Sequence, residues 1–597
     1  MKELEYPFDG RYLIKKKKSL KRELLSTDKQ FTEKKIAVLG GSTTHDIAAV
    51  LELFLLNEGI KPVIYESEYA KYWEDVMFEN PELKEFKPDL VYIHTTNRNI
   101  TQFPKPGMAK EDIDTLLEAD FNRFKVMWEK IAAYYNCPII QNNFEFPTYR
   151  LLGNQDCCLM EGRVNYINRL NLKFTEYAAN TKDFYIEDIQ YLSAQYGLDD
   201  WADPLYWHMY KYAVSMEAIP TLSYSVSRII KSLYGKNKKV LTLDLDNTLW
   251  GGIVGDDGPE NLAIGPETSM GQVYSEFQEY VKSHKDIGVI LTVDSKNDEE
   301  NALAGLNHPD GVLKPEDFIV IKANWDPKSK NLVDTANELN LLPESFVFVD
   351  DNPAEREIIK SQVPFAAVPD IGNVENYIKA IDHAGYFEVT KLSADDAKRN
   401  EMYKANAERA KMQASFTDYG EYLDSLEMKG IIDSFEPIFL DRITQLTNKS
   451  NQFNLTTKRY NRTEIEEVSS SEDYIELYGK LIDKFGDNGV VSVCIGRVNG
   501  EELDMDLWLM SCRVLKRDME FAMMDTLVAR AKSRGLKKIK GYYYPTAKNN
   551  MVREFYALMG FTKISEDEAG NTVWEFDLTK EYENKNKHIG VSENSSL

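Results

Sequence analysis

Two aspartates separated by one residue, Asp244 and Asp246, stand directly after an apolar run at 240–243. The run favours a central strand of a parallel sheet that is buried on both faces. Side chains two residues apart share one face at a strand end, so the two carboxylates lie close together and repel each other. A bound cation relieves such repulsion, and ligands of open α/β sheets bind at this edge. The pair therefore predicts a metal-dependent site with an acidic nucleophile.

Three further loops carry polar side chains, and each loop follows an apolar run. These residues are Ser295 after the run 288–293, Lys328 after the run 318–321, and Asp350-Asp351 after the run 345–349. Helical spacing at about 269–285 and 329–340 separates the runs, and this alternation predicts a parallel sheet with helices on both faces. A single Asp-x-Asp word is also typical of a capped turn. Four polar loops that meet at one sheet edge argue against that simpler interpretation.

The N-terminal third shows the same alternation of strands and helices. Residues 1–34 are basic, and they predict either a solvated helix face or a docking patch for an acidic partner. An apolar strand at 36–39 runs into Gly41-Ser42, and helical spacing follows at 46–57. Because Ser42 stands where a strand turns into a helix, its hydroxyl is either a nucleophile or an N-cap.

The C-terminal third changes pattern. Residues 391–429 read as a charged helical connector. Asn499-Gly500 between apolar strands at 490–498 and 503–510 then predicts a β-hairpin. A long helix at about 518–534 follows, and residues 581–597 are polar and are predicted to be a disordered tail. This order of elements predicts a separate α+β domain.

Composition limits the classes of protein. A chain of 597 residues exceeds what one hydrophobic core supports, and the net charge of −25 argues against a general nucleic-acid binder. The chain has five cysteines with no C-x-x-C spacing, which predicts reduced thiols in a cytoplasmic protein. We find neither a secretory signal nor an apolar run of about 18 residues, so we expect no membrane span.

Several sequence words carry a specific resemblance. The order Asp-x-Asp-x-Thr, Ser, Lys, Asp-Asp is similar to the haloacid-dehalogenase (HAD) phosphotransferase superfamily. The words LDNTLWGG, SKND, ANWDPKS and FVDDNPAERE resemble the FkbH-like branch of that superfamily, as do QNNFEFP and LGN upstream and NQFNLTT, FGDNG, SCRVL and PTAKN downstream. The resemblance covers nearly the whole chain.

The resemblance implies a role for each polar loop. Asp244 would be the nucleophile that becomes phosphorylated, and Asp246 the general acid and base. Ser295 would bind a phosphoryl oxygen, and Lys328 would offset negative charge. Mg²⁺ would be held by Asp244, by the backbone carbonyl of Asp246, and by Asp350 or Asp351, of which we favour Asp350.

The flanking segments resemble two other families. Residues 35–234 resemble an SGNH hydrolase, in which Ser42 would be the nucleophile; Asp203 and His208 are the candidates for the remaining pair, although they are five residues apart where the family spaces them by three. Residues 430–580 resemble a GNAT-like acyltransferase. Its coenzyme A loop would align with 513–518, which lacks both family glycines; Arg513, Lys516 and Arg517 remain as candidates for phosphate binding.

We therefore predict an α/β chain of three domains. They are a flavodoxin-like or SGNH-like sheet at 35–234, a Rossmann-like HAD core without a large cap at 235–390, and a GNAT-like α+β domain at 430–580. The short spacing from Asp246 to Ser295 leaves little room for a cap, which suits bulky or protein-borne substrates.

Three functions remain open. The FkbH-like branch implies loading of a glyceryl unit from 1,3-bisphosphoglycerate onto an acyl carrier protein, with dephosphorylation, for polyketide-type biosynthesis. The alternatives are a Mg²⁺-dependent phosphatase of a small metabolite, and a non-catalytic assembly protein. Family members often carry a cysteine directly before the Ser-Lys-Asn word, where this chain has Asp294. Cys512 is then the remaining candidate for an acyl-carrying thiol, unless it is a buried, inert cysteine.

Overall fold

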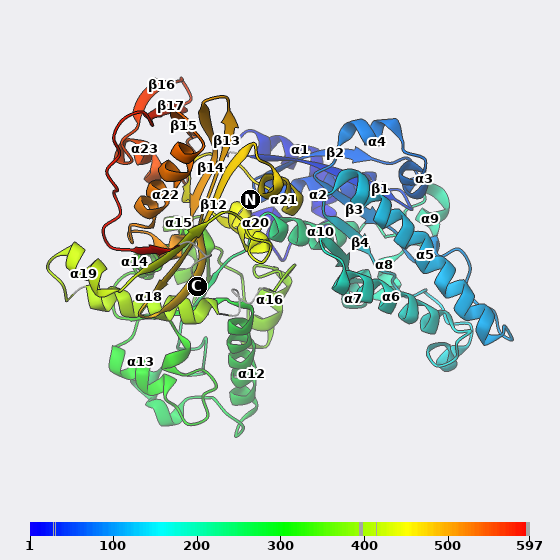
Figure 1. Ribbon diagram of the computed structural model, residues 1–597. Coiled ribbons are helices and arrows are strands. Elements are labelled where there is room, and N and C mark those ends of the chain that lie inside the picture. The colour runs from blue at the N-terminus through cyan, green and yellow to red at the C-terminus, as the bar shows by residue number, and fades with distance from the viewer. Residues whose placement is uncertain (28, 30, 393–397, 414, 593–597) are drawn as a thin grey trace. The chain divides into compact units, whose positions relative to one another are not determined.

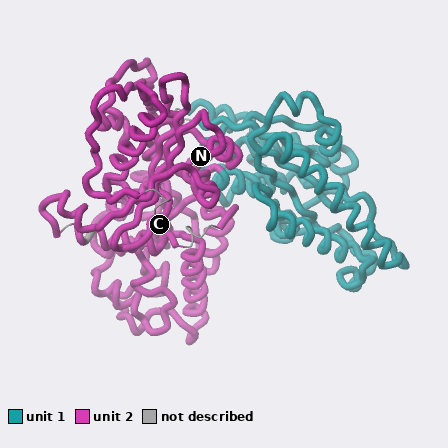
Figure 2. The backbone as a smooth tube through the Cα atoms, in the orientation of Figure 1, with its two compact units in different colours: residues 1–233 teal, residues 234–597 magenta. Residues whose placement is uncertain are grey.

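A computed structural model of the chain describes residues 1–27, 29, 31–392, 398–413 and 415–592. The chain divides into two compact units, Met1–Leu233 and Tyr234–Leu597, shown in different colours in Figure 2. Among the described residues, none of the helices combines the length and the apolar character that a membrane crossing requires.

The first unit is built on a parallel sheet with the strand order β2-β1-β3-β4-β5 (Figure 1). The strands are β1 (Thr32–Gly40), β2 (Ile60–Glu66), β3 (Leu90–His94), β4 (Ile139–Asn142) and β5 (Phe184–Glu187). This is the strand order of flavodoxin-like doubly wound sheets, which bind ligands at the carboxyl edge. The strand order agrees with the predicted flavodoxin-like sheet.

Helices cover the sheet of the first unit. The longest are α1 (Gly10–Leu25), α2 (His45–Asn57), α5 (Lys110–Tyr135), α6 (Arg163–Asn180) and α10 (Ile219–Leu233). Side chains of α5 and α6 form one core with Leu39, Val91 and Ile139 of the sheet. The alternate residues Ile36 and Val38 point to the other face and are also fully buried, so helices enclose both faces.

The basic N-terminal segment is part of the first unit. Helix α1 buries Leu13, Leu20 and Leu24 and packs against α2 and α10. Its Lys21 forms an ion pair of 2.7 Å with Glu52 of α2. Helix α1 is thus amphipathic, and its apolar side belongs to the core. Lys17 also pairs with α2, through Asp46, whereas Lys15, Lys16, Lys18 and Arg22 are exposed.

The second unit contains a parallel sheet with the order β8-β7-β6-β9. The strands are β6 (Val240–Leu243), β7 (Ile290–Ser295), β8 (Val320–Ala323) and β9 (Phe346–Val349). The helices around it are α11 (Val254–Asp257), α12 (Ser269–Ser283), α13 (Glu299–Leu306), α14 (Lys328–Glu338), α15 (Pro353–Gln362) and α16 (Tyr377–His383). Between β6 and β7, the described chain forms α11, α12 and short 3₁₀ turns but no separate cap domain.

A mixed sheet forms the rest of the second unit, in the order β16-β17-β15-β14-β13-β12-β10-β18. The strands are β10 (Lys429–Asp433), β12 (Tyr474–Asp483), β13 (Gly486–Asn499), β14 (Glu502–Met510), β15 (Lys538–Tyr543), β16 (Thr562–Glu566), β17 (Thr572–Asp577) and β18 (Gly590–Ser592), with β11 (Phe453–Asn454) paired to β14. The predicted hairpin is confirmed, and Gly500 supplies its positive φ of 61°.

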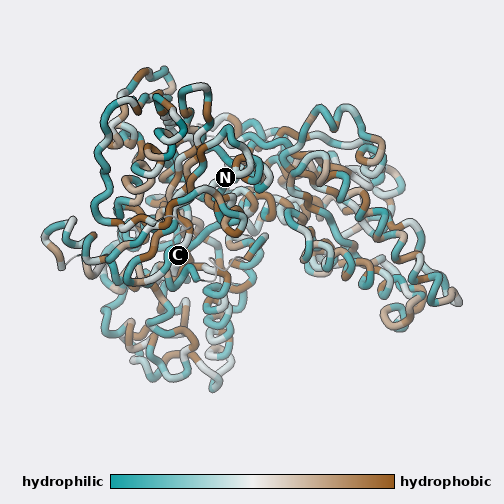
Figure 3. The backbone as a smooth tube through the Cα atoms, viewed as in Figure 1, coloured by the Kyte–Doolittle hydropathy of each residue, from teal (hydrophilic) through white to brown (hydrophobic). Residues whose placement is uncertain are grey.

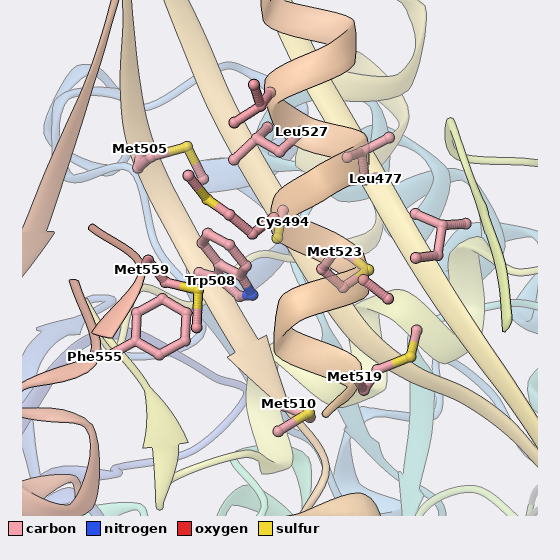
Figure 4. Packing of buried hydrophobic residues seen from close by; sticks show 14 of the residues in the cluster. Leu477, Cys494, Met505, Trp508, Met510, Met519, Met523, Leu527, Phe555 and Met559 are labelled. Atoms are coloured by element: carbon pink, nitrogen blue, oxygen red, sulfur yellow. The ribbon is translucent and has the colours of Figure 1, made fainter. Parts of the chain in front are cut away.

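Helix α22 (Met519–Ser533) packs on this mixed sheet through a sulfur-rich core. Met519 and Met523 of the helix belong to one buried cluster with Cys494 and Trp508 of the strands, and Figure 4 shows these side chains. These strands form the apolar centre of the unit, and Figure 3 colours much of them as hydrophobic. Flexible methionine side chains fill the irregular space between helix and sheet. The predicted long helix is therefore confirmed within one residue at each end.

Helix α18 (Arg399–Gln413) joins the two sheets of the second unit. Asn400 donates to the carbonyls of Lys285 and Val289, and Tyr403 is buried in the core formed by β6 and β9. Farther along the helix, Arg409 pairs with Asp483 of β12 at 2.7 Å. Within the predicted connector, 391–429, helix α18 therefore packs against both sheets; residues 393–397 and 414 lie outside the described part of the chain.

The predicted disordered tail is wrong for residues 581–592. Strand β18 pairs in parallel with β10, and Tyr582 donates to Asp525 at 2.5 Å. His588 lies 2.7 Å from Asp424. These contacts pair polar groups of the tail that, from composition alone, we expected to face solvent. Residues 593–597 lie outside the described part of the chain.

Candidate active site

The candidate site lies at the carboxyl edge of the sheet β8-β7-β6-β9. Strand β6 is an interior strand between β7 and β9, and its residues are almost fully buried because neighbours cover both faces. Asp244 follows it directly; its backbone N–H donates to the Val349 carbonyl at 2.9 Å, and the residue is 6% exposed. The sheet thus fixes the predicted nucleophile at the point where the chain leaves the core.

Lys328 is the first residue of α14 and lies between two carboxylates. Its Nζ is 2.9 Å from Asp244 Oδ1 and 2.5 Å from Asp350 Oδ2. Burial alone would lower the pKa of Lys328, but the negative charges of Asp244 and Asp350 outweigh it and raise the pKa. The lysine is therefore a fixed cation at the site, as the sequence predicts.

Asp244, Asp350 and Asp351 each offer a carboxylate oxygen, and these oxygens lie within 4.8 Å of one another. Burial, followed by the charge of Asp244, raises the pKa of both Asp350 and Asp351. Crowded carboxylates with raised pKa values and hard oxygen donors suit Mg²⁺. The donor set therefore fits the predicted ion, and one lysine charge does not balance the three carboxylates.

Asp246 is held by three donors. Its Oδ1 accepts from the Trp250 indole at 2.9 Å and from the Val254 backbone at 3.0 Å, and its Oδ2 accepts from Asn297 Nδ2 at 2.8 Å. Burial raises the pKa of Asp246 in spite of these donors. A half-buried carboxyl in this setting suits a group that releases a proton and then takes one back.

The residues that hold Asp246, and those that hold Asp350 and Asp351, were not predicted from the sequence. Trp250 and Asn297 bind Asp246, while Arg356 Nη1 donates to the carbonyls of Asp350 and Asp351 at 2.8 Å each. Asn297 stands two residues after Ser295, so the carboxyl-edge rule that selected Ser295 would also have found it. Arg356 lies on α15 and donates to backbone carbonyls, a contact that no sequence motif marks.

Ser295 ends β7 and is 2% exposed, beside the strand that carries Asp244. Its neighbour Asp294 is buried. The Oδ1 of Asp294 accepts from Asn331 at 3.1 Å, while Oδ2 has no hydrogen-bond partner in the described part of the chain. Burial raises the pKa of Asp294 to about 8. The position where the sequence resemblance implies a cysteine therefore holds a carboxyl that favours its neutral form.

The three candidate residues of an SGNH triad are not joined by hydrogen bonds. Ser42 is 2% exposed, and its Oγ has no hydrogen-bond partner among the residues that the structure describes. Asp203 instead caps α9 (Pro204–Tyr210) by accepting from the backbone of Leu205 at 2.8 Å. The fold brings the end of α9 near Ser42, because Thr43 donates to the Lys211 carbonyl at 2.9 Å. Catalysis by Ser42 stays a prediction.

Cys512 lies away from the carboxylates. Its Sγ is 3.9 Å from the Tyr403 hydroxyl, and it packs against the core of β6 and β9 on the side of Lys239, which precedes β6. Asp244 stands at the other end of that strand, about 16 Å from Lys239 at roughly 3.3 Å per residue. A thiol at this position does not reach the phosphoryl site directly.

The predicted phosphate contacts by Arg513 and Arg517 are corrected by the structure. The Arg517 guanidinium is buried; it pairs with Asp483 at 2.9 Å and donates to Asn406 at 2.6 Å. Arg513 is also buried and donates to Ser511 Oγ. Both guanidinium groups are committed to packing the unit. The exposed Lys516 stays a prediction.

Comparison with known families gives a match in the first unit. Residues 35–231 match the family model described as FkbH, N-terminal domain. No curated protein matches the chain.

Comparison with solved structures gives a similarity that covers most of the chain. It is the crystal structure of the N-terminal part of the protein BF1531 from Bacteroides fragilis, which contains a phosphatase domain complexed with Mg. The two share 27% sequence identity, with a TM-score of 0.57, over 63% of this chain and 98% of that one.

Two acetyltransferase structures match at a lower level. One is the ribosomal-protein-S18-alanine N-acetyltransferase from Escherichia coli, with 13% identity, a TM-score of 0.21, and coverage of 26% of this chain and 99% of that one. The other is the GNAT domain of S. lividans PAT, with 13% identity, a TM-score of 0.21, and coverage of 24% and 89%. At these TM-scores, neither similarity carries an argument about this chain.

Proposed function

We propose that the carboxyl edge of β6 transfers phosphoryl groups through an aspartyl phosphate. The chain is FkbH-like and resembles a phosphatase-containing structure complexed with Mg, which supports this proposal. The observation that carries the proposal is the contact of Lys328 with both Asp244 and Asp350, inside a cluster of three carboxylates. A lone capped turn does not need a buried cation shared between two loops.

The residues divide the reaction into two displacements. The Asp244 carboxylate attacks phosphorus, the bond to the leaving oxygen breaks, and Asp246 gives that oxygen a proton. Asp246 then takes a proton from water, which attacks the aspartyl phosphate and releases phosphate and free Asp244. Ser295 donates to a phosphoryl oxygen, and Lys328 offsets the charge that builds up on the transferring group.

Asp244, Asp350 and Asp351 would hold Mg²⁺, together with the backbone carbonyl of Asp246. When bound, Mg²⁺ neutralises phosphoryl charge and reduces the repulsion between nucleophile and substrate. The chain's own contribution is to fix the ligands. Arg356 orients the backbone of the aspartate pair, and Asn352 N donates to Asp350 Oδ1 at 2.9 Å.

We propose 1,3-bisphosphoglycerate as the substrate and an acyl carrier protein as the acceptor of its glyceryl unit. Asp244 would take the ester phosphate, while the carrier thiol would attack the acyl carbon, form the thioester and displace the acyl phosphate group as phosphate. The open carboxyl edge supports this, since a protein-borne acceptor needs access. Incubation with Mg²⁺, 1,3-bisphosphoglycerate and a pantetheinylated carrier protein, followed by mass spectrometry of both proteins, tests it. A glyceryl adduct on the carrier supports the proposal, whereas phosphate release without an adduct, under conditions where a relative forms one, refutes it.

The second candidate is a Mg²⁺-dependent phosphatase of a small phosphorylated metabolite. Two observations favour it: an aspartate, Asp294, and not a thiol stands directly before Ser295, and Cys512 packs at the other end of β6. This candidate predicts full phosphate release in a Cys512→Ser variant, with no dependence on a carrier. A carrier adduct that requires Cys512 would contradict it.

The C-terminal part of the second unit is, in our proposal, a GNAT-like fold that does not bind acetyl-coenzyme A in the standard way. Strands β14 and β15 pair only at Glu502–Asp504 and then diverge. The chain itself spans the gap, because Leu455 N donates to the Trp508 carbonyl and Tyr544 N donates to the Leu455 carbonyl. Because the chain occupies the gap between β14 and β15, docking of a carrier protein fits this domain better than acetyl transfer does.

A further inference from the structure

The carboxyl edge of the phosphoryl-transfer sheet exposes an aromatic side chain that the proposed chemistry does not use. Trp325 lies in the loop between β8 and α14 and is 70% exposed. An isolated exposed apolar residue is ordinary on a protein surface. This indole, however, is held in place: its Nε1 donates to Asp298 Oδ1 at 2.9 Å.

Asp298, which holds the Trp325 indole, does not make the stabilising contact that is common at its position. Asp298 occupies the N-cap position of α13, where an aspartate side chain normally accepts a backbone N–H and stabilises the helix by about 1 kcal/mol. Its side chain makes no cap hydrogen bond here and binds the indole instead. The loop is tied down at a second point, because Asn324 N donates to the Ser295 carbonyl at 3.1 Å. The two loops therefore hold Trp325 outward, at the rim of the site.

The rim lies on the leaving-group side of the site. Asn297, next to Asp298, binds Asp246, which is the proposed proton donor to the leaving oxygen. The turn on the other side of Asp246 exposes a second apolar residue: Ile253 is 45% exposed, and the following Val254 N donates to Asp246. Helix α11, which begins there, packs against α13.

We propose that Trp325 and Ile253 form a subsite for the leaving group of the substrate. This inference rests on the proposed phosphoryl-transfer function and adds a substrate class to it. The favoured substrates are phosphate esters whose leaving group carries a planar or apolar portion next to the ester oxygen. An indole offers such a group a large rigid face at little cost in side-chain entropy.

Two phosphate esters and one acyl phosphate test the subsite in the full-length protein with Mg²⁺. The esters are 2-naphthyl phosphate and phenyl phosphate, which differ in apolar size while their leaving groups have similar acidity, and the small substrate is acetyl phosphate. Trp325→Ala should lower kcat/KM for 2-naphthyl phosphate about tenfold, through KM, and change acetyl phosphate less than about twofold. Trp325→Phe should restore most of the loss, and Asp298→Ala should raise KM for the naphthyl ester by a smaller factor.

Phe365→Ala is the matched control. Phe365 is 72% exposed but lies toward the opposite edge of the sheet, since the nearby Ala367 N donates to Phe346 at the start of β9. This variant should leave all three substrates unchanged. Equal losses for 2-naphthyl and acetyl phosphate in Trp325→Ala, or no loss for either, would overturn the subsite.

Calorimetric binding of 2-naphthyl phosphate to Asp244→Asn separates the subsite from the chemistry. Weaker binding in the double variant Asp244→Asn/Trp325→Ala supports the subsite even without turnover. If the wild-type protein binds the ester through Trp325 but releases no phosphate from any substrate, the proposed function fails while the subsite stands. Binding that does not depend on Trp325 overturns the subsite.

Discussion

Replacing Lys328 with methionine should destabilise the metal-free protein far more than the Mg²⁺-loaded protein. Lys328 is nearly fully buried and contacts Asp244 at 2.9 Å and Asp350 at 2.5 Å. At an effective dielectric constant near 20, each contact is worth about 6 kcal/mol of gross attraction. Most of that offsets desolvation, and breaking a buried pair by removing one partner costs about 3–5 kcal/mol. Methionine keeps the unbranched apolar stem and lacks only the terminal ammonium group, so the loss is mainly electrostatic.

Urea unfolding of the second unit, followed by hydrogen exchange of β6 and α14, measures this loss in EDTA and in excess Mg²⁺. We expect a loss of about 3–5 kcal/mol in EDTA and less in Mg²⁺, because the cation takes over neutralisation of the carboxylates. Lys330→Met is the control: Lys330 lies on the same helix and pairs with Asp326, but it is 58% exposed, so its loss should stay below about 1 kcal/mol. Equal losses for the two variants, or a Lys328→Met loss that Mg²⁺ leaves unchanged, would refute the reasoning.

Three further predictions concern other parts of the chain. Asp246→Asn should lower kcat by about 10²–10⁴-fold with Mg²⁺ binding retained, and unchanged turnover would exclude its acid–base role. Burial raises the pKa of Glu145 to about 7, so the folded form keeps a proton that the unfolded chain releases above about pH 4.3. The free energy of unfolding of the first unit should therefore fall by roughly 2–4 kcal/mol as pH rises from about 4.3 to 7. Glu145→Gln should remove this pH dependence, measured by hydrogen exchange of β4. Arg517→Met should destabilise the C-terminal sheet by about 3 kcal/mol, whereas Lys516→Met should cost under 1 kcal/mol in thermal unfolding; equal effects would contradict the buried pair with Asp483.

The phosphoryl site is the part that sequence predicts best, for a physical reason. Each of Asp244, Lys328 and Asp350 follows an apolar run, and parallel strands bring their carboxyl ends to one edge. The observed pairing of β6 with β7 and β9, and of β7 with β8, follows from this parallel arrangement. The residues that orient the site are harder, since Asn297 and Arg356 act through hydrogen bonds that depend on side-chain direction.

The flanking regions show where sequence reasoning fails. Arg517 looks like a phosphate ligand because it lies in the segment that aligns with a coenzyme A loop, yet it pairs with Asp483, 34 residues earlier in the chain, and is buried. The tail looks disordered because it has few apolar residues, yet β18 pairs with β10, which lies far back in the chain. Both errors come from contacts distant in sequence, which local composition does not register.

The central claim is that Asp244 carries the phosphoryl group during turnover. Reduction of an acid-quenched, turning-over sample with borohydride converts an aspartyl phosphate into homoserine, which peptide mass spectrometry locates by position. The account predicts homoserine at position 244, dependent on Mg²⁺ and absent in Asp244→Asn. Phosphate release at an undiminished rate by Asp244→Asn, or a reduced residue at another aspartate, would contradict it.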